Sequence, residues 1–468
     1  MKTKKYPYIA LALIALTAFG GRTTAQSLND NGIFYHSFNS PWSYSINPAL
    51  FPTNLSRYST LPRTNVDLSL PFSYRDLNLH YDPEREATIF NLSDFLNMLY
   101  ERSLRFSANA DVNLLGHGYR LGERFHMGID IGMRNQSITT VPIELTKILT
   151  QGNMNENRHL ELGTSMLTHN MSYAYASVGL GYTHPVLPLT IGARVNVLDG
   201  IQLASIDKIT VDVLTSADTS TLTFVLDYMA HLGGILNIDP KNIGKTQFAF
   251  SFPHNFGFTV DLGAKFTLFD KLLISASLLD IGPGMKWNQH VKEIVPQNGP
   301  AHIDFDGFDV SRIRDTSYFR AVGDSLLQKL NFTTTEKEYW YAPPSRAYIG
   351  ASYTLFNMLR VGYLFHGEWS NGWFRPSGSQ GIFRFNNTLS LHFNLFDWLE
   401  LGVANSYTYD GQKPNFFNPG LMVSLNPGKQ VQLYAAVDYV SSMNLVDIRS
   451  AHVYFGMNIV ATKKDFDE

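Results

Sequence analysis

The sequence has 468 residues, of which 40 are acidic, 37 are basic and 13% are aromatic. Its Lys and Arg residues form no dense cluster, which argues against a nucleic-acid partner. It contains no cysteine, which excludes a disulfide framework, thiolate chemistry and a lipid anchor on an N-terminal cysteine.

Residues 1–25 have the pattern of a cleaved signal peptide. Lysines precede an apolar stretch, Tyr8–Phe19, and small residues lead to Gln26. The apolar stretch is too short to span a bilayer as a helix. Residues 1–25 hold four of the 37 basic residues and no acidic one, so 33 basic and 40 acidic residues remain after their removal. We expect an exported, acidic protein.

Residues 26–62 differ from the rest of the chain because prolines interrupt them and their polarity hardly alternates. Proline lacks a backbone donor and breaks strand pairing. The many aromatic residues of this stretch argue against disorder. We therefore expect residues 26–62 to form a plug segment that folds into the mouth or the interior of a barrel, and residues 63–468 to form that barrel. The candidate plug or ligand-binding residues are Trp42, Tyr44, Asn47, Pro48 and Ala49.

From residue 63 onward, apolar residues alternate with polar residues or glycine. In Phe256–Leu268, for example, Phe, Val, Leu and Ala alternate with Gly, Thr, Asp and Lys. Successive side chains of a strand point to opposite faces, so such a strand has one apolar and one polar face. Runs of about ten residues suit a tilted strand that crosses a bilayer. A soluble periplasmic β-protein would alternate too, but its strands average only about five or six residues.

No run of 18 apolar residues follows the leader, and a closed barrel is the other architecture that satisfies backbone groups in lipid. The predicted fold is all-β, a transmembrane antiparallel β-barrel of about 14 strands. The strand positions in chain order are Thr64–Phe72, Arg105–Leu115, Arg124–Arg134, Met171–His184, Leu189–Leu198, Phe256–Leu268, Lys271–Asp280, Arg346–Leu355, Leu359–His366, Thr388–Phe396, Leu399–Tyr409, Asn418–Leu425, Val431–Val440 and Ala451–Val460. Two further segments, Leu203–Leu214 and Thr221–Tyr228, either raise the number to 16 or form a hairpin on the outer side.

The connections alternate between short and long. Three short ones are nearly the same peptide, Leu268–Leu272, Leu355–Leu359 and Leu395–Leu399, and each has Asp or Asn in the middle. We expect these short turns on the periplasmic side and long loops on the extracellular side.

The polar face of the predicted strands holds most of their ionisable residues. A charge facing lipid at the middle of the bilayer would cost about 2–4 kcal/mol, so these side chains are expected to face the lumen. The candidate polar residues of the lumen are Asp111, Asp130, Arg134, Arg194, Asp261, Lys265, Arg360 and His392. Glycines at 257, 263, 350 and 362 are expected to let the plug approach the wall, or to kink the strands. The sequence indicates no catalytic residue, metal site or cofactor.

An ordered series of short motifs resembles a Bacteroidota outer-membrane family that is described only as a domain of unknown function. The resemblance rests on Asn255–Ala264, Leu279–Gly282 with Trp287, Phe305–Asp309, Asp324–Leu326, and Pro343-Pro344 before Ile349–Tyr353. Asn47-Pro48-Ala49 resembles an element of FadL-like barrels. The family is similar in architecture to FadL-type transporters and to the shuttle barrels of type IX secretion. The charged tail, Lys463–Glu468, departs from the aromatic C-terminus of other barrels.

The resemblance implies the fold and the location, an outer-membrane barrel, but no substrate. We expect passive passage of small hydrophobic or amphipathic compounds, because a blocked barrel excludes bulk water while an apolar pocket inside it holds the compound. Membrane lipid and such a compound are the expected partners. The alternative is a non-enzymatic scaffold barrel of a secretion or surface-assembly machine, with a protein partner. A third hypothesis is a barrel-embedded hydrolase, which requires Ser and His side chains within hydrogen-bond reach at the lipid boundary. We expect no enzyme, because no catalytic motif is present.

Overall fold

The computed structural model describes most of the chain after the leader. The described residues are 32–38, 40–77, 79–82, 87–90, 104–141, 158–161, 168–215, 222–237, 247–248, 255–305, 321, 325, 329–356, 358–369, 383–396, 398–409, 418–438 and 445–462. The expected signal peptide, residues 1–25, lies outside them, as do most of the motifs Phe305–Asp309 and Asp324–Leu326.

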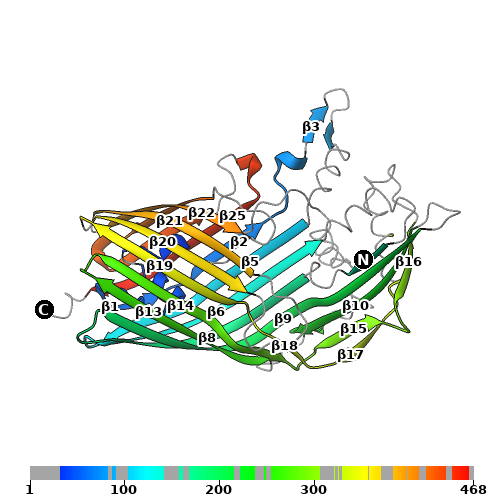
Figure 1. The fold of residues 1–468 in the computed structure, drawn as a ribbon, viewed down its shortest axis with the longest axis horizontal. Helices are drawn as coiled ribbons and strands as arrows, with labels where there is room; N and C mark the ends of the chain where they lie inside the picture. The colour runs from blue at the N-terminus through cyan, green and yellow to red at the C-terminus, as the bar shows by residue number, and fades with distance from the viewer. Residues whose placement is uncertain are drawn as a thin grey trace, which may run out of the picture.

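The chain forms a closed, antiparallel barrel of 14 strands (Figure 1). The wall consists of β1 (Leu55–Thr60), β2 (Arg63–Ser69), β5 (Leu104–Leu121), β6 (Phe125–Val141), β8 (Thr168–Thr183), β9 (Leu189–Thr215), β13 (Phe256–Leu268), β14 (Leu272–Trp287), β19 (Ser345–Leu355), β20 (Leu359–Trp369), β21 (Phe383–Phe396), β22 (Leu399–Tyr409), β23 (Pro419–Leu425), β24 (Val431–Asp438) and β25 (Ser450–Thr462). β1 and β2 share one position, since both pair with β25 on one side and with β5 on the other, which closes the barrel.

All fourteen predicted strand positions coincide with wall strands, and the alternative of 16 strands is wrong. β9 has 27 residues, more than twice the roughly ten that cross a bilayer. Its second half pairs with β10 (Leu222–Gly234), whose other edge pairs with β15 (Lys292–Pro296) and β16 (Ala301–Phe305) rather than with another wall strand. The segments at 203–214 and 221–228 therefore form a hairpin beyond the wall.

That hairpin belongs to a sheet that projects beyond one mouth of the barrel, at the right of Figure 1. The sheet also contains β7 (Arg158–Glu161) and β17 (Phe332–Glu336), and β18 (Tyr339–Tyr341) pairs with the end of β14. We call this projecting sheet the extension. Within it, burial favours the neutral form of Asp207, but hydrogen bonds from His231, Ser205 and Tyr339 hold the pKa of that carboxyl below its usual value.

The remaining elements are short. Two isolated hairpins are β3 (Leu79–Asp82) with β4 (Ala87–Phe90), and β11 (Leu236–Asn237) with β12 (Gln247–Phe248). The helical turns are η1 (Gly32–Phe34), α2 (Trp42–Ile46), η2 (Arg75–Leu77), η5 (Pro427–Lys429) and η6 (Leu445–Asp447). No helix among the described residues is both long enough and apolar enough to cross a membrane.

The wall begins at Leu55, inside the range 26–62 that was expected to form the plug. Pro62 separates β1 from β2, and a proline cannot donate to a ladder, which explains why the sequence pattern concealed the first strand position. Of the described residues of this range, 32–38 and 40–52 are mostly buried inside the barrel, and we call residues 32–54 the N-terminal segment.

The two faces of the wall differ as the alternation predicted. Apolar side chains on the outer face are exposed, among them Leu180 at 57% and Ile349 at 54%. The polar side chains of the opposite parity, such as Asp261 and His392, are buried in the lumen. This inverted distribution is that of a membrane-spanning barrel.

A charge on the outer face is expected to destabilise the barrel. Leu389 in β21 is 62% exposed there, and Leu389→Arg is expected to lower the free energy of unfolding by about 2–4 kcal/mol. Val186→Arg, in the short turn before β9 where the side chain is 84% exposed, serves as the control with a cost near zero to about 1 kcal/mol. Urea unfolding in phospholipid vesicles measures both values. Equal costs would contradict the assignment of the lipid face.

Candidate functional site in the barrel lumen

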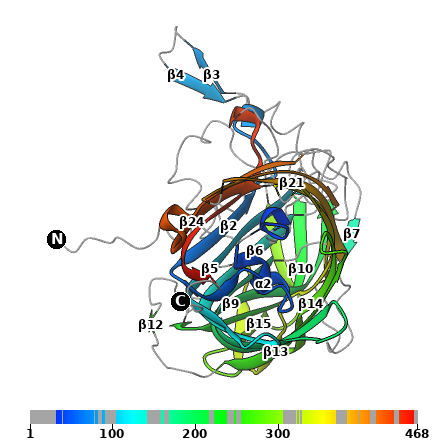
Figure 2. The ribbon, with the colours of Figure 1, turned by 90° about the vertical axis from the view of Figure 1, so that its left-hand side faces the viewer.

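The N-terminal segment lies inside the barrel, and α2 is seen within the ring of strands in Figure 2. Ile33 and Phe34 are completely buried, as are Asn47 and Ala49. Prolines at 41, 48 and 52 prevent this stretch from joining a ladder, so it folds into short turns instead of another strand. Its buried apolar side chains pack against the lumen side of β14, β19, β20 and β22–β25.

Asn47-Pro48-Ala49 is fixed to one part of the wall. The Asn47 amide donates to the carbonyl oxygens of Ala264 and Ala276, a cross-strand pair of β13 and β14, at 3.3 and 3.1 Å. Its Oδ1 accepts from the Ala49 N–H at 2.9 Å. His126 in β6 donates from Nε2 to the Pro48 carbonyl at 2.9 Å. The motif that resembles FadL-like barrels therefore reaches wall strands from β6 to β14, and its Asn47 amide and Pro48 carbonyl are hydrogen-bonded.

Wall glycines make room for the segment. A Cβ at Gly263 would lie 2.1 Å from Asn47 Oδ1, and one at Gly350 or Gly362 would lie within 2.5 Å of the Tyr35 or His36 ring. These three glycines confirm the predicted close approach. Gly257 has a different role. A Cβ there would lie 1.9 Å from the Gly284 carbonyl oxygen, so this glycine makes room for the backbone of β14 and not for the segment.

Aromatic rings anchor the segment at two further points. The Trp42 ring stacks on Phe34 with centroids 5.0 Å apart, and the Tyr434 and Tyr454 rings meet both of them at angles of 72–80°. Tyr44 packs against Tyr58 of the wall, at 6.5 Å, and against the ring of His126.

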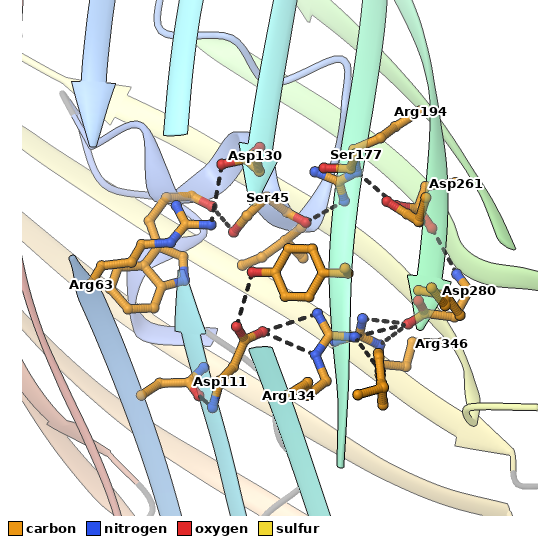
Figure 3. Close-up of a pocket in the computed structure, with 17 residues that line it drawn as sticks. Ser45, Arg63, Asp111, Asp130, Arg134, Ser177, Arg194, Asp261, Asp280 and Arg346 are labelled. Carbon is orange, nitrogen blue, oxygen red and sulfur yellow. Dashed lines mark hydrogen bonds and ion pairs between the residues drawn. The ribbon is translucent and has the colours of Figure 1, made fainter. Parts of the chain in front are cut away.

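Beside α2 lies a cluster of buried charges, shown in Figure 3. We call it the charged cluster; its members are Arg63, Arg134, Arg194, Arg346, Asp111, Asp130, Asp261 and Asp280. It lines a cavity of about 50 Å³ together with Trp42 and other side chains. Four arginines face four aspartates, so the cluster is neutral overall, as a buried site requires.

Most of these charges pair across neighbouring strands. Asp111 and Arg134 occupy directly opposite positions of β5 and β6, and the guanidinium contacts the carboxylate at 2.9 and 3.0 Å. Arg194 and Asp261 are opposite each other in β9 and β13, 2.7 Å apart. Such charge-assisted hydrogen bonds stabilise the pairing of neighbouring wall strands and orient the arginine side chains in the lumen.

Asp280 enters the cluster through an irregularity in β14. The pairing of β13 with β14 shifts register here, and Asp280 has a φ of 56°, in the left-handed region. Its carboxylate accepts two bonds from Arg346, and its N–H donates to Asp261 at 2.7 Å. The strain at this residue is offset by contacts inside the cluster.

Arg194 connects the cluster to the segment. Besides Asp261, it donates to the carbonyl oxygens of Tyr44 and Ser45, at 3.3 and 2.6 Å. The end of α2 is thus hydrogen-bonded to a buried wall cation.

A second polar contact fixes the start of the segment. Arg360 donates to the carbonyl oxygens of His36 and Ser37, at 3.0 and 2.9 Å, and its guanidinium lies 4.1 Å from the centre of the Phe38 ring. Glu400 accepts from the Ser37 hydroxyl and from the Phe38 N–H. His392 lies 3.2 Å from the Glu400 carboxylate.

The structure thus places the candidate plug residues, at 42, 44 and 47–49, in the lumen. Of the candidate polar residues, Asp111, Asp130, Arg134, Arg194 and Asp261 meet in the charged cluster, and Arg360 and His392 meet at the second contact. Lys265 faces the lumen four positions nearer the short turn than Asp261 and does not line the cavity.

Sequence reasoning missed Arg63, Asp280 and Arg346 as site residues. Arg63 is the first residue of β2, and Arg346 is the second residue of β19. At a strand end, the alternation of polar and apolar residues does not predict which face of the sheet a side chain points to. Asp280 lies within a quoted motif, Leu279–Gly282, but its direction depends on the irregularity in β14.

The hydrolase hypothesis requires a Ser–His pair at the lipid boundary, and Ser59 with His117 meets the distance at 2.9 Å on the outer side of the wall. Within the described residues, His117 has no hydrogen bond to a carboxylate, the group that orients the base of a serine hydrolase. Ser205 also lies 2.8 Å from His169, but its hydroxyl donates to Asp207, which leaves no proton for the histidine to remove.

The sequence family described as "Family of unknown function (DUF5723)" matches residues 48–438. No curated protein matches the chain. Solved structures similar to it include a deltaS2S3 mutant of the TodX monoaromatic hydrocarbon channel, with 11% identity, coverage of 94% of this chain and 96% of that one, and a TM-score of 0.43. The Pseudomonas putida toluene transporter TodX has 11% identity, coverage of 95% and 96%, and a TM-score of 0.41. An outer membrane channel from Pseudomonas putida F1 has 8% identity, coverage of 93% and 100%, and a TM-score of 0.32.

Proposed function

Because the chain belongs to this family of unknown function, we propose its function from the barrel itself: it is an outer-membrane channel for small hydrophobic or amphipathic compounds, and the N-terminal segment is its plug. One observation carries the proposal. The described part of the segment lies in the lumen, and wall side chains, Arg194 and Arg360 among them, hydrogen-bond to its backbone.

The size of the remaining space supports a plug that moves. Ligand pockets usually measure about 300–1,000 Å³, whereas the cavity beside α2 measures about 50 Å³. A compound larger than a few water molecules does not fit this cavity in this arrangement. Passage through this part of the lumen therefore requires displacement of part of the segment.

The chemistry of the lumen supports the proposed class of compound. The charged cluster lies between two buried apolar groups, one around Phe34 and Trp42 and the other around Trp287 in β14. An amphipathic compound finds apolar contacts and polar partners side by side, whereas an ion would have to displace the neutral pairs.

Uptake of N-phenyl-1-naphthylamine, a dye that fluoresces in apolar surroundings, tests the proposal. A Gram-negative host with an intact lipopolysaccharide layer that produces the full-length barrel is expected to take up the dye at least about tenfold faster than the same host without it, a change that corresponds to about 1.4 kcal/mol. A matched barrel whose segment is tethered by a disulfide is the control. Equal rates in host, barrel and tethered barrel would contradict the proposal.

The scaffold hypothesis has one favourable observation, the extension. Its strands β10 and β15–β17 project beyond the wall, at the end of the barrel opposite the short turn between β13 and β14 (Figure 1). A protein partner that co-purifies with the barrel in equal amount, and is lost when 222–234 is deleted, would support that function instead.

A further inference from the structure

The strongest unassigned feature of the lumen is a slot formed by Tyr434 of β24, Tyr454 of β25 and Arg63 of β2. In this structure the Phe34 and Trp42 rings fill it. They stack with an interplanar angle of 7°, and the two tyrosines meet them at 72–80° with centroids 5.3–5.5 Å apart. The Arg63 guanidinium lies over the Trp42 ring, 5.1 Å from its centre.

Each wall contact in this slot is specific for a flat aromatic ring. Both tyrosines meet the Phe34 and Trp42 rings at steep angles, the arrangement in which the positive edge of one aromatic ring approaches the negative face of another. A guanidinium over a ring is attracted by the negative face, which an alicyclic ring of the same size lacks. The wall would therefore make the same contacts with an aromatic compound that replaced the Trp42 ring.

Arg63 is less firmly paired than the other arginines of the charged cluster. It lies 4.0 Å from Asp130, whereas Arg134, Arg194 and Arg346 have carboxylate contacts of 2.9 Å or less. The Asp130 carboxylate already accepts from Asn113 at 2.8 Å. Within the described residues, Arg63 therefore has no carboxylate contact shorter than 4.0 Å, and its guanidinium shares that weak contact with the stacking contact on Trp42.

Trp42 itself is not fully satisfied in the slot. It is 3% exposed and lines the cavity, and its indole Nε1 has no hydrogen-bond partner among the described residues. A buried donor without a partner destabilises the arrangement that buries it. Release of Trp42 into water removes this cost, which favours exchange of the indole ring for a ring that has no N–H.

We propose that this slot is the ligand site of the channel, that it takes uncharged flat aromatic compounds of one or two fused rings, and that Phe34 and Trp42 occupy it as an internal substitute for that ligand. The inference rests on the proposed function, because it makes ligand binding and plug release one event. The neutrality of the charged cluster excludes a charged ligand, whose burial would leave an unbalanced charge.

Equilibrium binding to the purified full-length barrel tests the proposal, with naphthalene and the alicyclic decalin as probes. Naphthalene is expected to bind saturably and at least about tenfold more tightly than decalin. Arg63→Gln and Tyr454→Leu are each expected to weaken naphthalene binding by about tenfold and to leave decalin unchanged. Tyr454→Phe keeps the ring edge and retains full affinity, and Lys208→Gln in the extension is the control for handling.

Release of the segment is measured in the same samples with one added thiol. The natural chain has no cysteine, so Ser40→Cys introduces a single thiol at a position that is 2% exposed. Naphthalene is expected to raise its rate of maleimide labelling about tenfold, and decalin is expected to leave the rate unchanged. The proposal would be overturned if the barrel bound the two probes with equal affinity. It would also be overturned if neither Arg63→Gln nor Tyr454→Leu weakened naphthalene binding.

The two proposals fail separately. If naphthalene does not bind but a tethered segment still stops passage, the proposal of the aromatic slot is wrong and the proposed channel function stands. If passage continues while the segment is tethered, the proposed plug is wrong, whatever binds in the slot.

Discussion

Arg194→Ala is expected to lower the free energy of unfolding by about 3–5 kcal/mol and to loosen the N-terminal segment. The side chains of Arg194 and Asp261 are 8% and 3% exposed, so removal of the cation leaves an unpaired carboxylate in the interior. The same change removes two donors to the end of α2. Urea unfolding measures the first effect, and protease cleavage of the segment in the folded barrel measures the second.

An exposed ion pair of the extension gives the matched control. Lys208 and Asp227 also pair across strands, at 2.9 Å, but their side chains are 55% and 47% exposed. Lys208→Ala is expected to cost less than about 1 kcal/mol and to leave the segment protected. The account of the charged cluster would be wrong if both alanine variants had the same small effect.

Deletion of residues 32–50 is expected to open the lumen. The wall strands pair with one another, so their backbone hydrogen bonds persist without the segment and the barrel still closes. Arabinose, a small polar sugar, is expected to cross proteoliposomes at least about tenfold faster than with the complete chain, a change equivalent to about 1.4 kcal/mol.

Two controls make that deletion interpretable. Heat-modifiable mobility in gels shows whether the shortened chain still forms a barrel. Deletion of 222–234 in the extension removes a comparable length outside the lumen and is expected to leave arabinose flux unchanged. A folded deletion variant with unaltered flux would show that residues 32–50 do not obstruct the barrel.

The wall could be predicted from the sequence because lipid and lumen impose opposite polarity on neighbouring residues. The sequence of Phe256–Leu268 follows this rule throughout, and the structure confirms it over Phe256–Leu262, where more exposed and more buried side chains alternate. β1 escaped prediction because it has only six residues and Pro62 follows it closely. In β5 a register shift between Asn113 and Leu115 puts both Leu114 and Leu115 on the outer face, which a strict period of two does not foresee.

The site could be predicted only in part, because polarity indicates a face but not a partner. The partners in the pairs Asp111–Arg134 and Arg194–Asp261 are 23 and 67 residues apart in sequence, and they meet only because of the register between their strands. The contribution of Asp280 depends on a left-handed backbone conformation that nothing in its own residue type demands. The aromatic slot needs β24 and β25 beside β2, which follows only from closure of the barrel.

The central claim is that passage requires the N-terminal segment to leave the wall. Asn47→Cys with Gly263→Cys places two thiols where the Asn47 side chain meets the missing Cβ of Gly263, in a chain that has no other cysteine. We predict that dye uptake stops when this pair is oxidised and returns to the rate of the untethered barrel after reduction. Uptake at one rate in both redox states would contradict the claim.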